Sequence, residues 1–191
     1  MNKNVKYLVY PYLLMWIVIF VLPYFSLDNY SIIKNTTSHL GAQSTPNAWI
    51  MNVVFILLGA GSIYSGWSML KYFWVQRTLL LIFGLSLISA AFFRHAPIDP
   101  TLPYIPRYDE LHSIFASITG FSFTLFAIST AFVLKTKTQK ICAAGIAILA
   151  MSLSILMFTV GDYMGVWQRM IFICSFGWMI YIFKTENHFV S

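Results

Sequence analysis

The chain has 191 residues, of which 59% are hydrophobic and only 9% charged, with a mean hydropathy of +0.73 and a net charge of +6. A soluble globular domain carries about 25% charged residues, so this composition excludes a soluble protein and predicts an integral membrane protein. The positive charge does not indicate nucleic-acid binding, because the basic residues are dispersed along the chain and form no basic patch.

Six apolar runs follow one another along the chain, most of them near the ~20 residues that a helix needs to cross the hydrocarbon core. Backbone polar groups cannot stay unpaired in lipid, so each run is predicted to be a helix. We therefore expect an all-α integral membrane protein, a single domain over residues 1–191 built as a bundle of six transmembrane helices. The runs are 7–26, 49–74, 78–93, 111–134, 141–160 and 164–183.

The distribution of lysine and arginine predicts how the bundle is oriented, because cytoplasmic loops carry an excess of these residues. If both termini are cytoplasmic, eight basic residues lie at inner helix ends and four at outer ends. The inner set is Lys3, Lys6, Lys71, Arg77, Lys135, Lys137, Lys140 and Lys184, and the outer set is Lys34, Arg94, Arg107 and Arg169. We expect both termini to lie inside.

The side chains able to do acid–base or metal chemistry are distributed very unevenly between the two sides. Glu186 and His188 fall near the C-terminus on the inner side. The remaining acidic residues and histidines all fall at predicted outer ends: Asp28, Asp99, Asp109, Glu110, Asp162, His39, His95 and His112. This asymmetry predicts a functional site on the outer face.

The connection between the third and fourth runs has a regular proline spacing. Pro97, Pro100, Pro103 and Pro106 recur every three residues, which is the period of a polyproline II helix. The connection is therefore either a stiff strut or an irregular loop, since proline is common in both. Asp109 is expected to cap the N-terminus of the fourth helix.

The fourth run also carries small residues at helical spacing: Ser113, Ser117, Gly120, Thr124, Ala127 and Ala131. Such a stripe favours close helix packing, with a polar conduction path as the alternative. The helix interiors contain no charged side chain in mid-membrane, which argues against an ion-driven carrier.

Three short motifs resemble the domain-of-unknown-function 998 family of prokaryotic membrane proteins. They are SHLGA after the first run, FRHAPIDP after the third and DELHSIFAS at the start of the fourth. The family's Ser-Asp-Leu-Gly element is here Ser38-His39-Leu40-Gly41, so a carboxylate is missing at residue 39. The resemblance implies a six-helix protein, set in a prokaryotic cytoplasmic membrane, and it implies no particular reaction.

The leading functional hypothesis is a polar outer site that binds a lipid headgroup, a small anion or a partner protein. Membrane lipids are then the expected partners, nucleic acid is not, and the oligomeric state stays open. The candidate ligand-binding residues are Ser38, Arg94, Arg107, Glu110 and Arg169.

The alternative hypothesis is a zinc-dependent hydrolase of a lipid-like substrate at the outer face. A catalytic zinc site needs about three protein ligands and an open water position. His39, His95 and His112 are the candidate metal ligands, and zinc is the candidate cofactor. The candidate catalytic carboxylates are Asp99, Asp109 and Asp162, which could orient the ligands or act as a base. A transporter is the second alternative.

Overall fold

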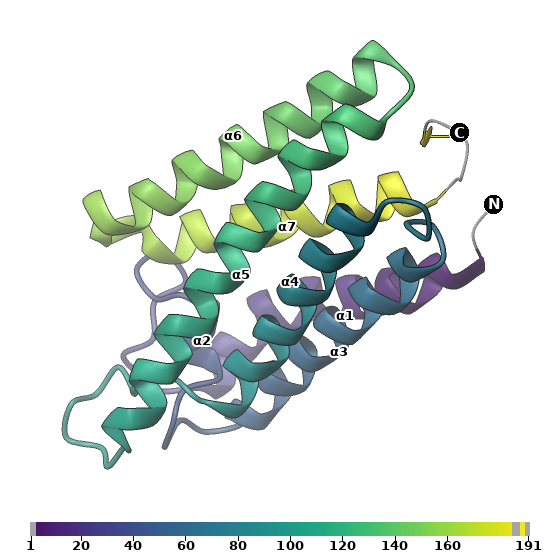
Figure 1. Ribbon diagram of the computed structural model, residues 1–191. Coiled ribbons are helices and arrows are strands. Elements are labelled where there is room, and N and C mark those ends of the chain that lie inside the picture. The colour runs from purple at the N-terminus through teal and green to yellow at the C-terminus, as the bar shows by residue number, and fades with distance from the viewer. Residues whose placement is uncertain (1–2, 185–187, 190–191) are drawn as a thin grey trace.

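The computed structural model describes residues 3–184, 188 and 189. Six of its helices are long and apolar enough to cross a membrane, which confirms the all-α bundle predicted from the sequence (Figure 1). The long helices are α1 (Lys6–Val21), α3 (Ala48–Trp67), α4 (Trp74–Phe92), α5 (Pro106–Val133), α6 (Lys137–Thr159) and α7 (Met164–Phe183). The short elements are η1 (Lys3–Val5), η2 (Leu22–Phe25), α2 (Thr37–Leu40) and η3 (Gly161–Tyr163).

Several helix boundaries differ from the predicted ones by four to seven residues, and two of these differences have a clear local cause. The second membrane helix ends at Trp67 and not at Trp74, because the short connection to α4 is itself apolar and hydropathy does not mark its start. α5 begins at Pro106 and not at residue 111. Proline is favoured at the first helical position, where its fixed φ suits the helix and its missing N–H costs nothing.

The bundle core is formed by helices that are neighbours in the sequence, with α7 closing it against α1 and α6. Phe55, Phe126, Phe176 and Phe183 are among the largest side chains with almost no exposed surface. Small residues let α3 and α4 approach closely, since a Cβ at Gly59 would lie 2.6 Å from the carbonyl oxygen of Gly84.

The small-residue stripe on α5 does not pack along its whole length. Ala127 is buried, but Ser113, Ser117 and Gly120 are exposed, and nothing lies within 4 Å of a Cβ built at Gly120. The expectation of close packing was therefore wrong for the first half of this helix. Figure 1 shows that α6 diverges from α5 toward this end of the bundle.

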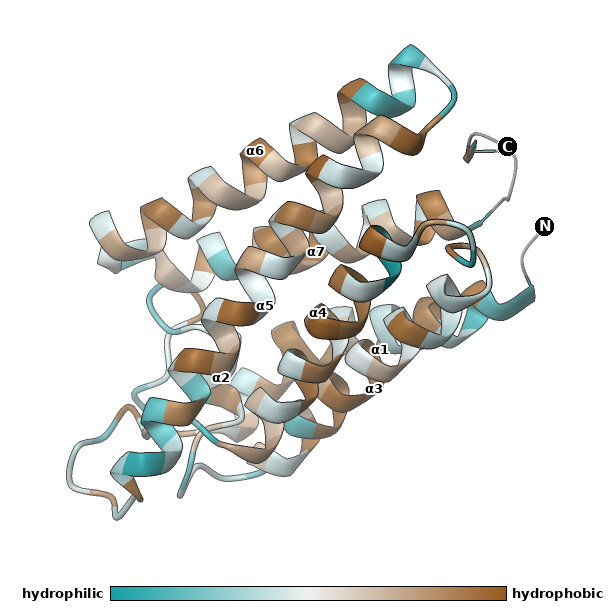
Figure 2. Cartoon of the chain, in the orientation of Figure 1, coloured by the Kyte–Doolittle hydropathy of each residue, from teal (hydrophilic) through white to brown (hydrophobic). Residues whose placement is uncertain are grey.

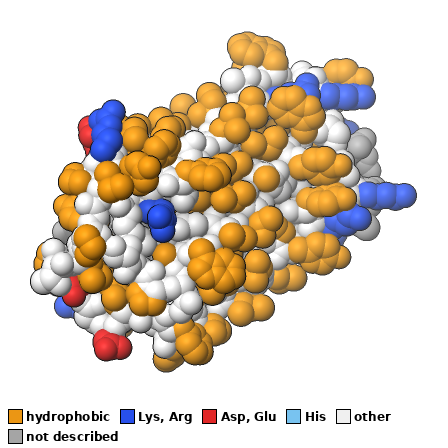
Figure 3. All heavy atoms as spheres, turned by 90° about the horizontal axis from the view of Figure 1, so that it is seen from below, with side chains coloured by type: hydrophobic (Ala, Val, Ile, Leu, Met, Phe, Trp, Pro, Cys, Tyr) orange, Lys and Arg blue, Asp and Glu red, His pale blue; other side chains and the backbone are white. Residues whose placement is uncertain are grey.

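The two ends of the bundle differ in charge. We call the end formed by residues 26–47, 93–105 and 160–163 the histidine end, and the opposite end, where α1 starts and α7 finishes, the terminal end (Figure 1). Hydrophilic residues gather at these ends, whereas the middle of the helices is hydrophobic (Figure 2). Figure 3 shows acidic side chains only toward the histidine end of the visible face, whereas basic side chains appear at both ends.

The acidic residues that the structure describes lie either in these segments (Asp28, Asp99 and Asp162) or near the start of α5 (Asp109 and Glu110). Glu186, which the sequence assigns to the other side, lies outside the described residues.

Candidate functional site

Three histidine rings from three separate segments meet at the histidine end. The ring of His95 lies between the other two, with its centroid 4.7 Å from that of His39 and 5.1 Å from that of His112. His39 belongs to α2, His95 follows α4, and His112 lies in the second turn of α5. Together with Asp109, which contacts His95, they form what we call the histidine cluster.

His39 is held by the start of α2. Its Nδ1 accepts the backbone N–H of Thr36 at 3.2 Å and lies 2.8 Å from the Thr36 hydroxyl. This is a capping box in which histidine takes the place usually held by Glu or Gln. Gln168 of α7 fixes the same turn, because its side-chain oxygen accepts from the backbone N–H and the hydroxyl of Thr37 at 2.7 and 2.6 Å.

Burial, which is the largest cause, and repulsion from His95 and His112 together lower the pKa of His39 from 6.5 to about 4, although Asp109 acts in the opposite direction. The ring is therefore neutral at neutral pH. Neutrality agrees with its hydrogen bonding, because a protonated Nδ1 could not accept the Thr36 N–H.

His95 is oriented by Asp109 and by its own backbone neighbourhood. Its Nδ1 lies 2.9 Å from the carboxylate of Asp109 and 3.2 Å from the carbonyl oxygen of Ala96. The same carboxylate oxygen accepts the backbone N–H of Ala96 at 2.8 Å. Asp109 was expected to cap α5, but Ile105 is the N-cap residue, so the carboxylate is free to bind the connection that carries His95.

Gln43 joins the connection between α4 and α5 (residues 93–105) to the first connection, which lies between α1 and α3 (residues 26–47). Its side-chain nitrogen donates to the carbonyl oxygens of Arg94 and Ile105, and its side-chain oxygen accepts from the N–H of Ile105 at 2.8 Å. Its backbone N–H donates to the carbonyl oxygen of His95 at 2.9 Å. Gln43 is 6% exposed, so these bonds are shielded from water.

His112 is buried, with 4% of its surface exposed. Its Nδ1 lies 2.8 Å from the carbonyl oxygen of Ala90 and 2.9 Å from that of Phe93. The last carbonyl groups of a helix have no partner within the helix, and here His112 satisfies two of them at the end of α4. The histidine thus joins α4 to α5 where the cluster forms.

The residues present do not fit the zinc centre that the sequence suggested. Among the residues that the structure describes, no three His, Cys, Asp or Glu side chains are arranged to hold a metal ion. In addition, a neutral His39 whose Nδ1 accepts a hydrogen bond carries its proton on Nε2, so that nitrogen has no lone pair for a metal.

The other two candidate catalytic carboxylates are engaged elsewhere. Asp99 accepts from the hydroxyl and the backbone N–H of Thr101 at 2.7 and 2.9 Å, and these hydrogen bonds hold the pKa of its carboxyl below the ordinary value. The N–H of Leu102 donates to the carbonyl oxygen of Asp99 and closes a turn. This turn interrupts the segment from Pro97 to Pro106, so the connection is not a continuous polyproline strut. Asp162 is exposed and pairs with Lys34 at 3.5 Å.

Four of the five candidate ligand-binding residues lie within two residues, along the sequence, of a member of the histidine cluster. Arg94 is exposed and immediately precedes His95, and Ser38 is buried beside His39 in α2. Arg107 and Glu110 form an exposed ion pair with a 2.6 Å contact on the first turn of α5. An exposed pair of this kind contributes little to stability, so both side chains remain open to exchange with a ligand.

Arg169, the fifth, has a different role. It is 4% exposed, and all three nitrogens of its guanidinium donate to groups of the protein itself. It fixes the first connection against α1 and α7 and has no free N–H for a ligand. Its acceptors are the carbonyl oxygens of Ile19, Ile32, Asn35 and Gly165 and the hydroxyl of Tyr30.

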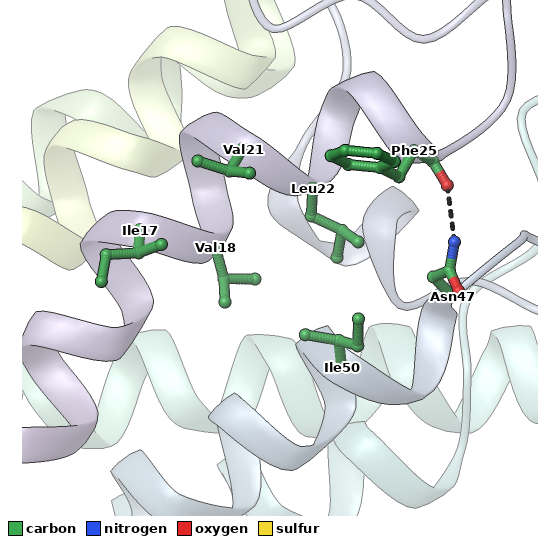
Figure 4. Close-up of a pocket in the computed structure, with 7 residues that line it drawn as sticks. All are labelled: Ile17, Val18, Val21, Leu22, Phe25, Asn47 and Ile50. Carbon is green, nitrogen blue, oxygen red and sulfur yellow. Dashed lines mark hydrogen bonds between the residues drawn. The ribbon is translucent and has the colours of Figure 1, made fainter.

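Two surface grooves lie near this end of the bundle. One runs between the end of α1 and the start of α3, and its lining, which includes Val18, Phe25 and Ile50, is almost entirely apolar (Figure 4). At the edge of this groove, the side-chain nitrogen of Asn47 donates to the carbonyl oxygen of Phe25 at 2.9 Å. The other lies along α5 and includes Glu110, Ser113 and Ser117. Neither of these two grooves extends along the length of the bundle, as a transport path across the membrane would.

A family model described as "Protein of unknown function (DUF998)" matches residues 13–183. The chain belongs to this family. The match confirms the resemblance seen in the three sequence motifs and establishes a polytopic membrane protein of the DUF998 family. No curated protein and no solved structure matches the chain.

Proposed function

We propose that this DUF998 protein binds the polar headgroup of a lipid or lipid-like molecule, and that the histidine cluster is the contact site. The observation that carries the proposal is the meeting of three rings from three segments, at centroid distances of 4.7 and 5.1 Å. Each ring is held through Nδ1 by a different part of the protein, which leaves the three Nε2 atoms for another molecule.

The depth of the cluster supports a lipid ligand. His95 lies three residues beyond the end of α4, and His112 lies in the second turn of α5. Side chains at the ends of membrane-spanning helices lie near the lipid headgroups. A headgroup can therefore reach the cluster while its acyl chains remain in the bilayer, and the exposed guanidinium of Arg94 can assist with a phosphate or carboxylate.

We further propose that the histidine end faces the outside of the cell. The basic residues of the helix ends support this orientation, with eight on the terminal end and four on the histidine end. A membrane-impermeant thiol reagent should label a cysteine introduced at Ser44 in intact cells and should not label one at Lys137. The reverse pattern would contradict the orientation.

The test of lipid binding uses the purified full-length protein and native mass spectrometry with three added lipids. The lipids are phosphatidylglycerol, monoglucosyl diacylglycerol and phosphatidic acid. We compare the wild type with His95→Phe, which keeps a ring between the neighbouring rings and removes both nitrogens. His188→Phe, in the segment after α7, is the matched control.

At least one lipid should bind the wild type and the control equally and His95→Phe more weakly. Equal binding of every lipid to all three proteins would overturn the proposal.

A further inference from the structure

The hydrogen-bond partners of the three histidines fix where each ring carries its proton. A backbone N–H can only donate, so the Nδ1 of His39 accepts and its Nε2 bears the hydrogen. A carbonyl oxygen can only accept, so the Nδ1 of His112 donates and its Nε2 has a lone pair. The Nδ1 of His95 faces a carboxylate and a carbonyl, so it donates too.

The cluster therefore presents a mixed set of hydrogen-bonding groups. When the rings are neutral, His39 offers one N–H donor on Nε2, while His95 and His112 each offer one lone pair there. In the part of the chain that the structure describes, no protein group forms a hydrogen bond with any of these three Nε2 atoms. Burial, together with repulsion from His95 and His112, lowers the pKa of His39, so its ring stays neutral and keeps the hydrogen on Nε2 at neutral pH.

This set discriminates between classes of ligand. A metal ion requires a lone pair on every ligating nitrogen, and His39 lacks one. A phosphate or carboxylate group requires donors, and the two lone pairs together with the Asp109 carboxylate repel it. An ammonium group has no acceptor for the N–H of His39. A hydroxyl both donates and accepts, so two neighbouring hydroxyls can satisfy all three rings.

We propose that the histidine cluster recognises a hydroxyl-bearing group, such as the sugar or glycerol of a lipid headgroup, through one imidazole N–H and two imidazole lone pairs. This inference rests on the proposed function and names its ligand class. Asp109 acts as a positioning residue, because its carboxylate holds the proton of His95 on Nδ1 and directs the lone pair of Nε2 toward the ligand.

The first experiment measures the proton positions directly. The protein is labelled with ¹⁵N-histidine, placed in phosphatidylcholine nanodiscs at pH 7.5 and studied by NMR, in which Nδ1 and Nε2 shifts report the tautomer. We expect the Nε2–H tautomer for His39 and the Nδ1–H tautomer for His95 and His112. The same tautomer for all three rings would overturn the proposal.

The second experiment adds three probes to the same nanodiscs: monoglucosyl diacylglycerol, phosphatidic acid and soluble methyl glucoside. The glucosyl lipid should shift the Nε2 signals of the cluster, and phosphatidic acid, which has a phosphate and no headgroup hydroxyl, should not. Shifts with phosphatidic acid alone would overturn the hydroxyl inference and leave headgroup binding standing. Shifts with methyl glucoside alone would support the hydroxyl and contradict the lipid source. No shift with any probe would overturn both.

A pair of variants at His39 tests the donor. His39→Gln keeps an acceptor for the Thr36 N–H and also keeps an amide N–H, whereas His39→Glu keeps the acceptor and removes the donor. The affinity for the glucosyl lipid should fall about tenfold in His39→Glu and less than about threefold in His39→Gln. Equal affinities in the two variants, both folded as judged by the remaining histidine signals, would contradict a donor role for His39.

Discussion

The imidazole of His95 donates its Nδ1–H to the carboxylate of Asp109 over 2.9 Å, and the same carboxylate oxygen accepts the N–H of Ala96 over 2.8 Å. Asp109 thereby links α5 to the connection that leaves α4. One side chain fixes both the path of the backbone around His95 and the proton of its ring.

The first prediction concerns this link. Asp109→Ala should lower the free energy of unfolding by about 1–3 kcal/mol, because it leaves two donors without their acceptor. Reversible unfolding in mixed micelles measures the change. Glu110→Ala is the matched control, since it removes only an exposed pair with Arg107 and should change stability by less than about 1 kcal/mol. Equal losses in the two variants would show that the carboxylate of Asp109 does not stabilise the connection.

The second prediction concerns Arg169. Arg169→Lys keeps the positive charge but cannot reach acceptors on three segments at once, so buried carbonyl oxygens lose their donors. The expected loss is about 3 kcal/mol or more, with faster proteolysis in residues 26–36. Arg94→Lys is the control, because Arg94 is exposed, and it should leave both measurements unchanged. Wild-type protease resistance in Arg169→Lys would contradict the anchoring role.

The third prediction is a pH dependence of stability. The unfolded chain binds a proton at His39 below about pH 6.5, whereas the folded chain binds it only below about pH 4. The neutral ring therefore contributes its full stability above pH 6.5. That contribution is lost as the pH falls toward about 4, and the total is on the order of 3 kcal/mol.

Unfolding midpoints measured from pH 8 to pH 4 test this window. His39→Gln keeps the capping acceptor and does not titrate, so its stability should fall less steeply between about pH 6.5 and pH 4. Parallel curves for the variant and the wild type would show that the ring of His39 does not carry the effect.

The sequence predicts the six helices and the side on which the histidines and carboxylates gather, because hydropathy and helix length determine both. It does not predict that His39, His95 and His112 meet, since residues 26–47 and 93–105 could fold in many ways over the bundle. Their path depends on single side chains such as Gln43 and Arg169, whose partners lie far away in the sequence.

Two local signals in the sequence carry more information than hydropathy. Pro106 marks the start of α5, and with that start Asp109 falls inside the first turn rather than at the cap. Thr36 followed three residues later by His39 is a capping box with an unusual third member. An aspartate at residue 39 could also accept the N–H of Thr36, so the local turn does not depend on histidine.

The fourth prediction concerns Gly165, where α7 meets the first connection. Its N–H donates to the carbonyl oxygen of Ile33 at 2.9 Å, and a Cβ here would clash with the carbonyl oxygens of Ile32 and Asn35. Backbone oxygens cannot move aside as a flexible side chain can, so Gly165→Ala should displace residues 32–35 from Arg169. We expect the free energy of unfolding to fall by about 1–3 kcal/mol and lipid binding to weaken.

Gly145→Ala on α6 is the control, because a Cβ there meets nothing within 4 Å and alanine favours the helix. If Gly165→Ala matched this control in stability and in lipid binding, the close approach of α7 to the first connection would not be what holds α2 and His39 in place.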